Sequence, residues 1–331
     1  MVFLQSKNSE ISTNSVIEWL LAFNTPFIRS NGESPVHIHS FSICPATGIR
    51  IVLEVNGRLV DLNDITAYWH RRSQLSFSYD KNLLEQLGQG LPIKYARGMY
   101  HNFLSQYRSL ENYINHKFTT VPRHIGNSSN SVVNKLLSLD HAISCGILVP
   151  DTCITGDKKE LLDFRKEKGD IITKAILDSV FLWDDNENIV HYTELMDDEK
   201  IAMLPETFAL SLFQQCSTKR CEIRSFFLRG KFYSMAIFSQ SDKQTTVDFR
   251  KYNDEKPNRN IPFSLPAELE EKLSRLMNIL KLDTGSIDLI LTQNGEYIFL
   301  EVNPVGQFAM VSHPCNYYIE KDIAAYLSGI N

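Results

Sequence analysis

The stretch from Ser286 to Phe308, SIDLILTQNGEYIFLEVNPVGQF, constrains the fold more than any other part of the chain. Asn294-Gly295 lies between two runs rich in β-branched and aromatic residues. This pattern is the strongest short-range signal for a β-hairpin with a two-residue type I′ turn. If the strands pair residue by residue back from that turn, Asp288 lies directly opposite Glu301.

The two opposed carboxylates indicate a site rather than a plain hairpin. Asn303 is two residues beyond Glu301 and therefore on the same face of its strand, so three oxygen donors converge. Like charges that lie opposite each other repel. A hard divalent cation such as Mg²⁺, with oxygen ligands and bound phosphates, is the usual reason for such an arrangement.

A solvated hairpin whose acids point outward is the alternative interpretation. The face opposite Asp288 is expected to be apolar, and the Asp288 face still carries Ile290 and Phe299. We therefore expect a hairpin that is half or more buried, where acids need a partner. The expected apolar face consists of Leu289, Leu291, Ile298, Leu300 and Val302.

Composition excludes some broad classes of protein. The 331 residues are 43% hydrophobic and 22% charged, with a net charge of -5, so charge gives no argument for a nucleic-acid partner. No apolar run approaches the roughly 20 residues that span a bilayer, and no secretory signal is present. The six cysteines form no CxxC pair. We expect a soluble, cytoplasmic protein with reduced thiols and neither a membrane nor a nucleic-acid partner.

The pattern of elements predicts an α/β fold with α+β parts. The chain opens on a strand, helix, strand pattern, and the helix is expected to begin with a capping box at Ser15–Glu18. Asn127–Asn130 is the most linker-like segment. We expect an N-terminal α/β domain over residues 1–126, a central α+β layer over 127–206 and a C-terminal part with the hairpin over 207–331.

A basic and aromatic cluster, Tyr68-Trp69-His70-Arg71-Arg72, follows the strands of the first domain. The two arginines are compatible with a solvated strand end. Adjacent guanidinium groups near the end of an α/β strand are equally suited to hold carboxylates or phosphates. The residues alone leave both interpretations open.

Two lysines stand out because the common phosphate-binding motifs are absent. The chain has neither a GxxxxGK[ST] loop nor a GxGxxG turn after a strand. Lys135 lies near the start of a predicted helix, and Lys174 lies in the middle of a predicted strand. The alternative for Lys174 is a charged residue that protects an edge strand.

The order of these features resembles that of the ATP-grasp ligases, in which two flexible subdomains hold ATP between them. More closely, the chain is similar to the graspetide macrocyclases, the microviridin-type enzymes, and among them to the grasp-with-spasm peptide maturases. The broader resemblance is carried by Asn134-Lys135, Lys174, the run FQQCSTKRCEIR, and Asp288 with Glu301 and Asn303. The narrower one rests on Ser12-Thr13 with Val16 and Trp19-Leu20, Ile28–Asn31, Tyr68–Arg72 and the ending FLEVNPVGQF.

The resemblance implies a three-subdomain ATP-grasp fold with an N-terminal α/β domain, and a set of nucleotide contacts. Lysines would contact the α- and β-phosphates, a hinge would meet adenine through its backbone, and a carboxylate would hold the ribose hydroxyls. The matching residues are Lys135 and Lys174 for the phosphates, Gln214, Gln215, Cys216 and Ser217 for the hinge, Glu222 for the ribose, and Asn303 beside the metal.

Further implied roles concern the metal and the transferred phosphoryl group. Asp288, Glu301 and Asn303 would bind Mg²⁺, expected as two ions, which agrees with the geometry inferred from the hairpin. Arg224 and Arg250 would be catalytic and face the γ-phosphate or the acyl phosphate. Arg71 and Arg72 would contact the substrate.

The activity implied by the resemblance is carboxylate activation on a precursor peptide with a leader and a core. An Asp or Glu side chain would attack the γ-phosphate of ATP, and a Thr, Ser or Lys side chain would then displace phosphate to close an ester or amide ring. A homodimer is a further expectation. Two alternatives remain: a ligase that adds amino acids to a protein or small-molecule carboxylate, and a non-catalytic ATP-binding regulator.

Overall fold

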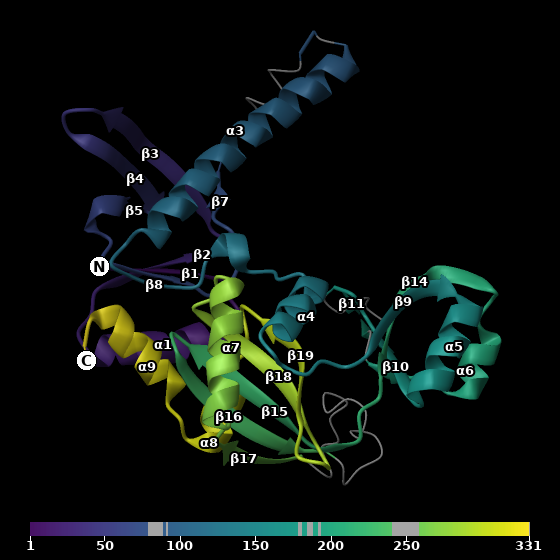
Figure 1. Ribbon diagram of the computed structural model, residues 1–331. Helices are drawn as coiled ribbons and strands as arrows, with labels where there is room; N and C mark the ends of the chain where they lie inside the picture. The colour runs from purple at the N-terminus through teal and green to yellow at the C-terminus, as the bar shows by residue number, and fades with distance from the viewer. Residues whose placement is uncertain are drawn as a thin grey trace. The chain divides into compact units, whose positions relative to one another are not determined.

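The computed structural model describes residues 1–78, 89–90, 92–177, 181–183, 188–190, 193–239 and 258–330 (Figure 1). They form two compact units. The first comprises Met1–Ser131 with Tyr318–Asn331, and the second comprises Val132–Tyr317. No helix among these residues is both long and apolar enough to cross a membrane.

The first unit contains a parallel sheet built from apolar runs of the N-terminal sequence. Its strand order is β2-β1-β6-β8. All five residues of β1 are buried, as expected for a parallel strand that is covered on both faces. Helices α1 and α9 pack against each other. The elements are β1 (Val2–Ser6), α1 (Ile11–Ala22), β2 (Phe27–Asn31), β6 (Ala67–His70), β8 (Arg123–Ile125) and α9 (Ile319–Ser328).

A second sheet of the first unit has the order β5-β4-β3-β7. Asn56 and Gly57 join β4 to β5 with φ angles of 52° and 74°. Positive φ at both loop residues is what a type I′ turn requires. The remaining elements of this unit are β3 (Pro35–Cys44), β4 (Gly48–Val55), β5 (Arg58–Asp61), β7 (Ser76–Phe77), α3 (Ile93–Thr119) and the 3₁₀ turns Leu62–Asp64 and Ser128–Asn130.

Stacked aromatic rings hold the core of the first unit together. Tyr68 lies parallel to Phe118 with ring centroids 4.5 Å apart, and Phe3 lies 4.6 Å from the same Phe118 ring. Phe118 comes from the C-terminal part of α3, so the long helix is anchored at that end. Burying rings of this size gives a large hydrophobic stabilisation.

Helix α1 begins five residues before the start that its sequence suggests. It starts at Ile11 with Glu10 as N-cap, and Ser15 lies inside the helix with its hydroxyl 3.5 Å from the Ile11 carbonyl oxygen. The expected capping box at Ser15–Glu18 is therefore wrong. Ser12 and Thr13 are buried, so packing of the first turn outweighs the local capping preference.

The second unit is built on a five-stranded antiparallel sheet of order β17-β16-β15-β18-β19 (Figure 1). Helix α7 packs its apolar stripe of Leu269, Leu273, Leu276 and Met277 into the core on one face of this sheet. The i, i+4, i+7, i+8 spacing of these residues is that of a core-facing helix. The elements are α4 (Lys135–Ser144), β15 (Lys219–Leu228), β16 (Lys231–Phe238), β17 (Arg259–Phe263), α7 (Ala267–Ile279), β18 (Thr284–Thr292), β19 (Tyr297–Asn303) and α8 (Ala309–Cys315).

A smaller layer of the second unit has the strand order β13-β10-β14-β9 and is covered by α5 and α6. Strand β14 begins at Thr207 and pairs with β9 and β10. The terminal helix α9 lies in the first unit. The elements are β9 (Thr152–Asp157), α5 (Lys158–Lys168), β10 (Ile171–Lys174), β13 (Glu194–Leu195), α6 (Asp198–Met203) and β14 (Thr207–Gln215). Strands β11 (Phe181–Trp183) and β12 (Asn188–Val190) pair with each other in a separate two-stranded sheet.

The loop between β18 and β19 has three residues. The Thr292 amide donates to the Glu296 carbonyl, and the Gly295 amide donates to the Thr292 carbonyl. Gly295 has φ 86°, but Asn294 is not at positive φ. The two-residue type I′ turn expected at Asn294-Gly295 is therefore wrong, and the loop is of the three-residue kind that ends in a left-handed glycine.

A β-bulge restores the register beyond this loop. Near the turn Leu289 pairs with Phe299, whereas Asp288 pairs with Glu301, so Leu300 is the extra residue of the bulge. Phe299 is fully buried in the core with Leu289, and Ile298 pairs with Ile290 on the Asp288 face. The sequence predicted Ile298 on the apolar face and Phe299 on the Asp288 face, and the structure shows the reverse. The reason is that a one-residue slip turns each side chain to the opposite face.

Alanine substitutions at Phe299 and Leu300 test the bulge. Phe299→Ala should lower the free energy of unfolding by about 3–5 kcal/mol, because it empties a core position. Leu300→Ala should cost about 1 kcal/mol or less, because Leu300 is not buried in that core. Chemical denaturation of both variants measures the difference. The reverse order would mean that the loop has two residues and that the strands pair without a bulge.

Candidate functional site

Two carboxylates lie opposite each other on one face of the five-stranded sheet. Asp288 of β18 pairs with Glu301 of β19, which confirms the expected pairing, and Ser286 pairs with Asn303 at the next position on that face. The Asn303 side-chain amide donates to Glu301 Oε1 at 3.3 Å. The three oxygen-bearing side chains expected to converge are therefore neighbours.

A lysine from the start of α4 reaches Glu301. Asn134 caps the helix by accepting from the amides of Leu136 and Leu137. Lys135, the first helical residue, places Nζ 3.2 Å from Glu301 Oε2 and 3.0 Å from the Leu177 carbonyl oxygen. The cap thus fixes where the helix starts and, with it, where the ammonium group lies.

The electrostatics of Glu301 reflect this neighbourhood. Burial would raise the pKa of the Glu301 carboxyl, but the Lys135 and Lys174 ammonium groups and hydrogen bonds from Lys135 and Asn303 outweigh it. The pKa therefore lies below its ordinary value, and Glu301 is ionised at neutral pH. Lys174, the last residue of β10, thus contributes to the same field as Lys135.

Arg224 provides the cation for the second carboxylate. It lies beside Asp288 on the neighbouring strand β15, with Nη1 3.3 Å from Asp288 Oδ1. Asp288 and Glu301 each face a different cation, which reduces the repulsion between them. The Nε atom of Arg224 is buried and has no hydrogen-bond partner within the described part of the chain.

Glu222 occupies the same sheet face, two residues before Arg224. The carboxylate is buried, and it accepts from Lys219 Nζ and from the Ser239 hydroxyl, each at 2.5 Å. Sequence reasoning missed Lys219 and Ser239 here. The spacing i, i+3 between Lys219 and Glu222 along a strand gave no signal of their contact.

The predicted hinge residues span the end of β14 and the loop to β15. The amides of Gln215 and Cys216 donate to the carbonyl oxygens of Asp151 and Asp170. The Gln214 side chain donates to Thr152 Oγ1 at 3.0 Å, and its Oε1 is buried without a partner in the described residues. Ser217 lies in the loop itself.

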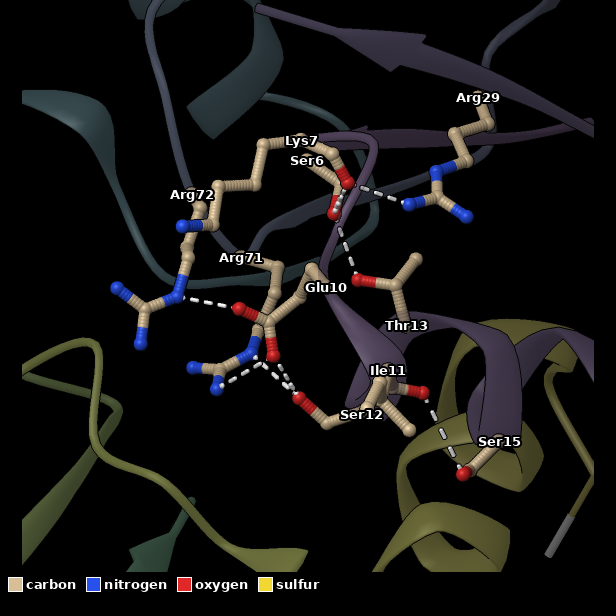
Figure 2. Close-up of polar contacts among 10 residues, drawn as sticks. All are labelled: Ser6, Lys7, Glu10, Ile11, Ser12, Thr13, Ser15, Arg29, Arg71 and Arg72. Carbon is tan, nitrogen blue, oxygen red and sulfur yellow. Dashed lines mark hydrogen bonds and ion pairs between the residues drawn. The ribbon is translucent and has the colours of Figure 1, made fainter. Parts of the chain in front are cut away.

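The two arginines assigned to the substrate lie in the first unit, after β6. Arg71 is only 3% exposed, so the solvated alternative does not hold for it. Figure 2 shows both guanidinium groups directed at the carboxylate of Glu10 at the start of α1. Sequence reasoning missed Glu10, because it placed the start of the helix at Ser15. Arg250 lies outside the described residues.

The donor set of the second unit fits a polar, anionic ligand and a hard cation. Within the described ranges no three or more His, Cys, Asp and Glu side chains form a metal-binding group, so the expected site relies on two carboxylates and the Asn303 amide. Carboxylate and amide oxygens suit Mg²⁺. Among the described residues, three buried polar atoms of this unit have no hydrogen-bond partner: Arg224 Nε, Ser286 Oγ and Gln214 Oε1.

Comparison with known proteins establishes the fold. No protein-family model matches the chain, and no curated protein matches its sequence. An ATP-grasp ligase associated with a RiPP from Chryseobacterium gregarium, solved with ADP and a leader and core peptide, is similar in structure with a TM-score of 0.76. It is 21% identical, and the match covers 99% of this chain and 95% of that one.

Two further solved structures match over a similar extent. The macrocyclase MdnC of Microcystis aeruginosa, bound to the precursor peptide MdnA, has a TM-score of 0.72 and 22% identity over 99% of this chain and all of that one. The ATP-grasp ligase PsnB, complexed with a minimal precursor, Mg and ADP, has a TM-score of 0.67 and 14% identity, covering 99% and 96%. This protein therefore has the ATP-grasp fold along nearly its whole length.

Proposed function

We propose that this protein is an ATP-dependent ligase that closes rings in a ribosomally made precursor peptide. It would join an Asp or Glu side chain of the peptide to a Thr or Ser hydroxyl, or to a Lys amine, of the same peptide. The observation that carries this proposal is the Asp288–Glu301 pair with its flanking cations Lys135 and Arg224. The ADP, Mg and precursor peptides in the similar structures support it.

The nucleotide would lie between the lysines and the sheet that carries the acid pair. Lys135 and Lys174 would contact its phosphates, and Glu222 its ribose. The loop that contains Cys216 and Ser217 would meet adenine. Gln214 Oε1, which has no hydrogen-bond partner among the described residues, suits an N–H donor such as the exocyclic amine of adenine.

Asp288, Glu301 and Asn303 would hold Mg²⁺, which when bound would neutralise charge on the phosphates. We propose two ions in this site. In the proposed complex Lys135, which lies 3.2 Å from Glu301, would share its charge between that carboxylate and a phosphate oxygen. Arg224 would remain beside Asp288 and direct toward the phosphoryl oxygens its Nε, from which no described residue accepts a hydrogen bond.

The chemistry would proceed in two steps. A carboxylate oxygen of the peptide attacks the γ-phosphorus, the bond to the β-phosphate oxygen breaks, and ADP leaves. A hydroxyl or amine of the peptide then attacks the acyl phosphate carbon, loses its proton, and releases phosphate. Arg224 and Arg250 would stabilise charge on the transferred group, which is the main catalytic contribution a protein makes to phosphoryl transfer. A cytoplasmic location and a homodimer belong to the same proposal.

Mass spectrometry of a precursor peptide tests the proposed activity. Incubation with ATP, Mg²⁺ and the peptide encoded beside the gene should remove one water per ring and release one ADP per ring. A mass increase with an added amino acid would instead indicate a ligase of the amino-acid-adding kind. Nucleotide binding without any peptide-dependent ADP would contradict both enzymatic functions.

Substitution of Glu301 tests the acid pair. Glu301→Gln should lower peptide-dependent ADP release by at least about 100-fold, because it removes a charged oxygen ligand at the phosphoryl-transfer site. Glu296→Gln is the matched control, since Glu296 lies in the same hairpin and is exposed. Turnover of Glu301→Gln near that of the control would remove the metal assignment, provided that both variants unfold cooperatively.

Lys135→Met tests the phosphate contact. Loss of a charge-assisted hydrogen bond, worth about 1.5–3 kcal/mol, should weaken ATP binding by about tenfold or more. Lys272→Met is the control, because Lys272 pairs only with exposed Glu268 on the surface of α7 among the described residues. Titration calorimetry with ATP measures both variants. Equal affinities would exclude a direct contact between Lys135 and the nucleotide.

A further inference from the structure

A buried carboxylate organises the two arginines that follow β6. Glu10 is 6% exposed and lies at the start of α1. Its Oε1 atom lies 3.1 Å from Arg71 Nη2 and accepts from the Ser12 hydroxyl, which in turn accepts from Arg71 Nε at 3.1 Å. Arg71 is thus enclosed in a network of buried hydrogen bonds (Figure 2).

Arg72 is held differently from its neighbour. Its Nε atom forms an ion pair with Glu10 Oε2, and its side chain is 29% exposed. No other ion pair or hydrogen bond of the Arg72 guanidinium occurs within the part of the chain that the structure describes. The Nε edge of the guanidinium therefore lies against Glu10, while the two terminal amino groups form no ion pair or hydrogen bond with the described residues.

The surroundings of Arg72 favour an anion. The guanidinium groups of Arg71 and Arg72 share the single carboxylate of Glu10. The cluster of these three side chains therefore keeps a net positive charge. Figure 2 shows the Lys7 side chain extending to the same side of the cluster as Arg72. The cluster lies just beyond the carboxyl ends of β1 and β6, which are neighbouring parallel strands. Ligands of open α/β sheets bind at this edge.

We propose that Glu10 is a positioning residue, which clamps Arg72 so that its outer fork receives a carboxylate of the peptide substrate. Arg71 then belongs to the support of the site and does not contact the substrate. A planar guanidinium with a fixed inner edge offers two parallel N–H donors, which is the geometry that carboxylates and phosphates share. The identity of the ligand as a peptide carboxylate rests on the proposed function.

The choice of variant matters because Arg71 is buried. Glu10→Gln would leave that guanidinium without its counter-charge, and breaking a buried ion pair from one side is strongly destabilising. Glu10→Asp keeps the counter-charge near Arg71 but withdraws the carboxylate by one methylene, which weakens its contact with Arg72 as well as with Arg71. Arg72→Gln removes the fork directly. Arg50→Gln is the matched control, since Arg50 pairs with Asp61 at the surface of the same unit.

Binding of a fluorescent peptide rich in Asp and Glu, followed by anisotropy, tests the proposal without any need for turnover. Arg72→Gln and Glu10→Asp should each weaken binding by about tenfold, and Arg50→Gln should not. The double variant should bind as Arg72→Gln does, because two residues that act through one contact are not additive. An added loss in the double variant would show that Glu10 acts elsewhere and would overturn the positioning role.

Competition identifies the ligand. An unlabelled peptide of the same sequence should displace the probe, and its Asn and Gln counterpart should not. Displacement by inorganic phosphate at lower concentration than by the acidic peptide would assign the fork to a phosphoryl group and overturn the peptide assignment. Wild-type protein that binds the peptide through Arg72 but never converts it would contradict the proposed function alone. Conversion that is unaffected in Arg72→Gln would contradict this inference alone.

Discussion

The second unit depends on keeping two carboxylates side by side on a largely buried sheet face. Asp288 and Glu301 are tolerated because each faces a cation from a different element, Arg224 from β15 and Lys135 from α4. The arrangement requires the strand order, the cap of α4 and the register of the hairpin to be correct together. An error in any one of them would leave a buried charge without compensation, which costs more than most packing defects.

The sequence predicted this pair correctly although it predicted the turn wrongly. The dipeptide Asn56-Gly57 forms the two-residue loop that its composition favours, and Asn294-Gly295 does not. The difference arises from packing. Phe299, rather than Leu300, enters the core beside Leu289. Local propensity carries no information about which of two adjacent apolar residues occupies a given position in the core. The loop and the bulge then shift the register by one residue each, in opposite directions.

The sequence identified only some of the residues whose role depends on partners far away in the chain. Lys135 and Lys174 could be singled out by position and by a family resemblance, but their common effect on Glu301 needed three elements to be placed together. Nothing in the sequence indicated that Glu10 is important, since its partners are two arginines about sixty positions away. The same holds for the contact of Lys219 and Ser239 with Glu222, because strand pairing brings together residues that no periodicity links.

The bulge at Leu300 has a consequence for how such chains can diverge. Insertions and deletions are tolerated well in a hairpin loop. If a one-residue change at the turn shifts the strand register, however, every residue of the shifted strand turns to the opposite face of the sheet. Here the slip introduced at the turn ends at Leu300, before it reaches Asp288 and Glu301. A three-residue loop with this bulge and a two-residue loop without it therefore place the same acid pair opposite each other, so the loop can change by one residue without moving the site.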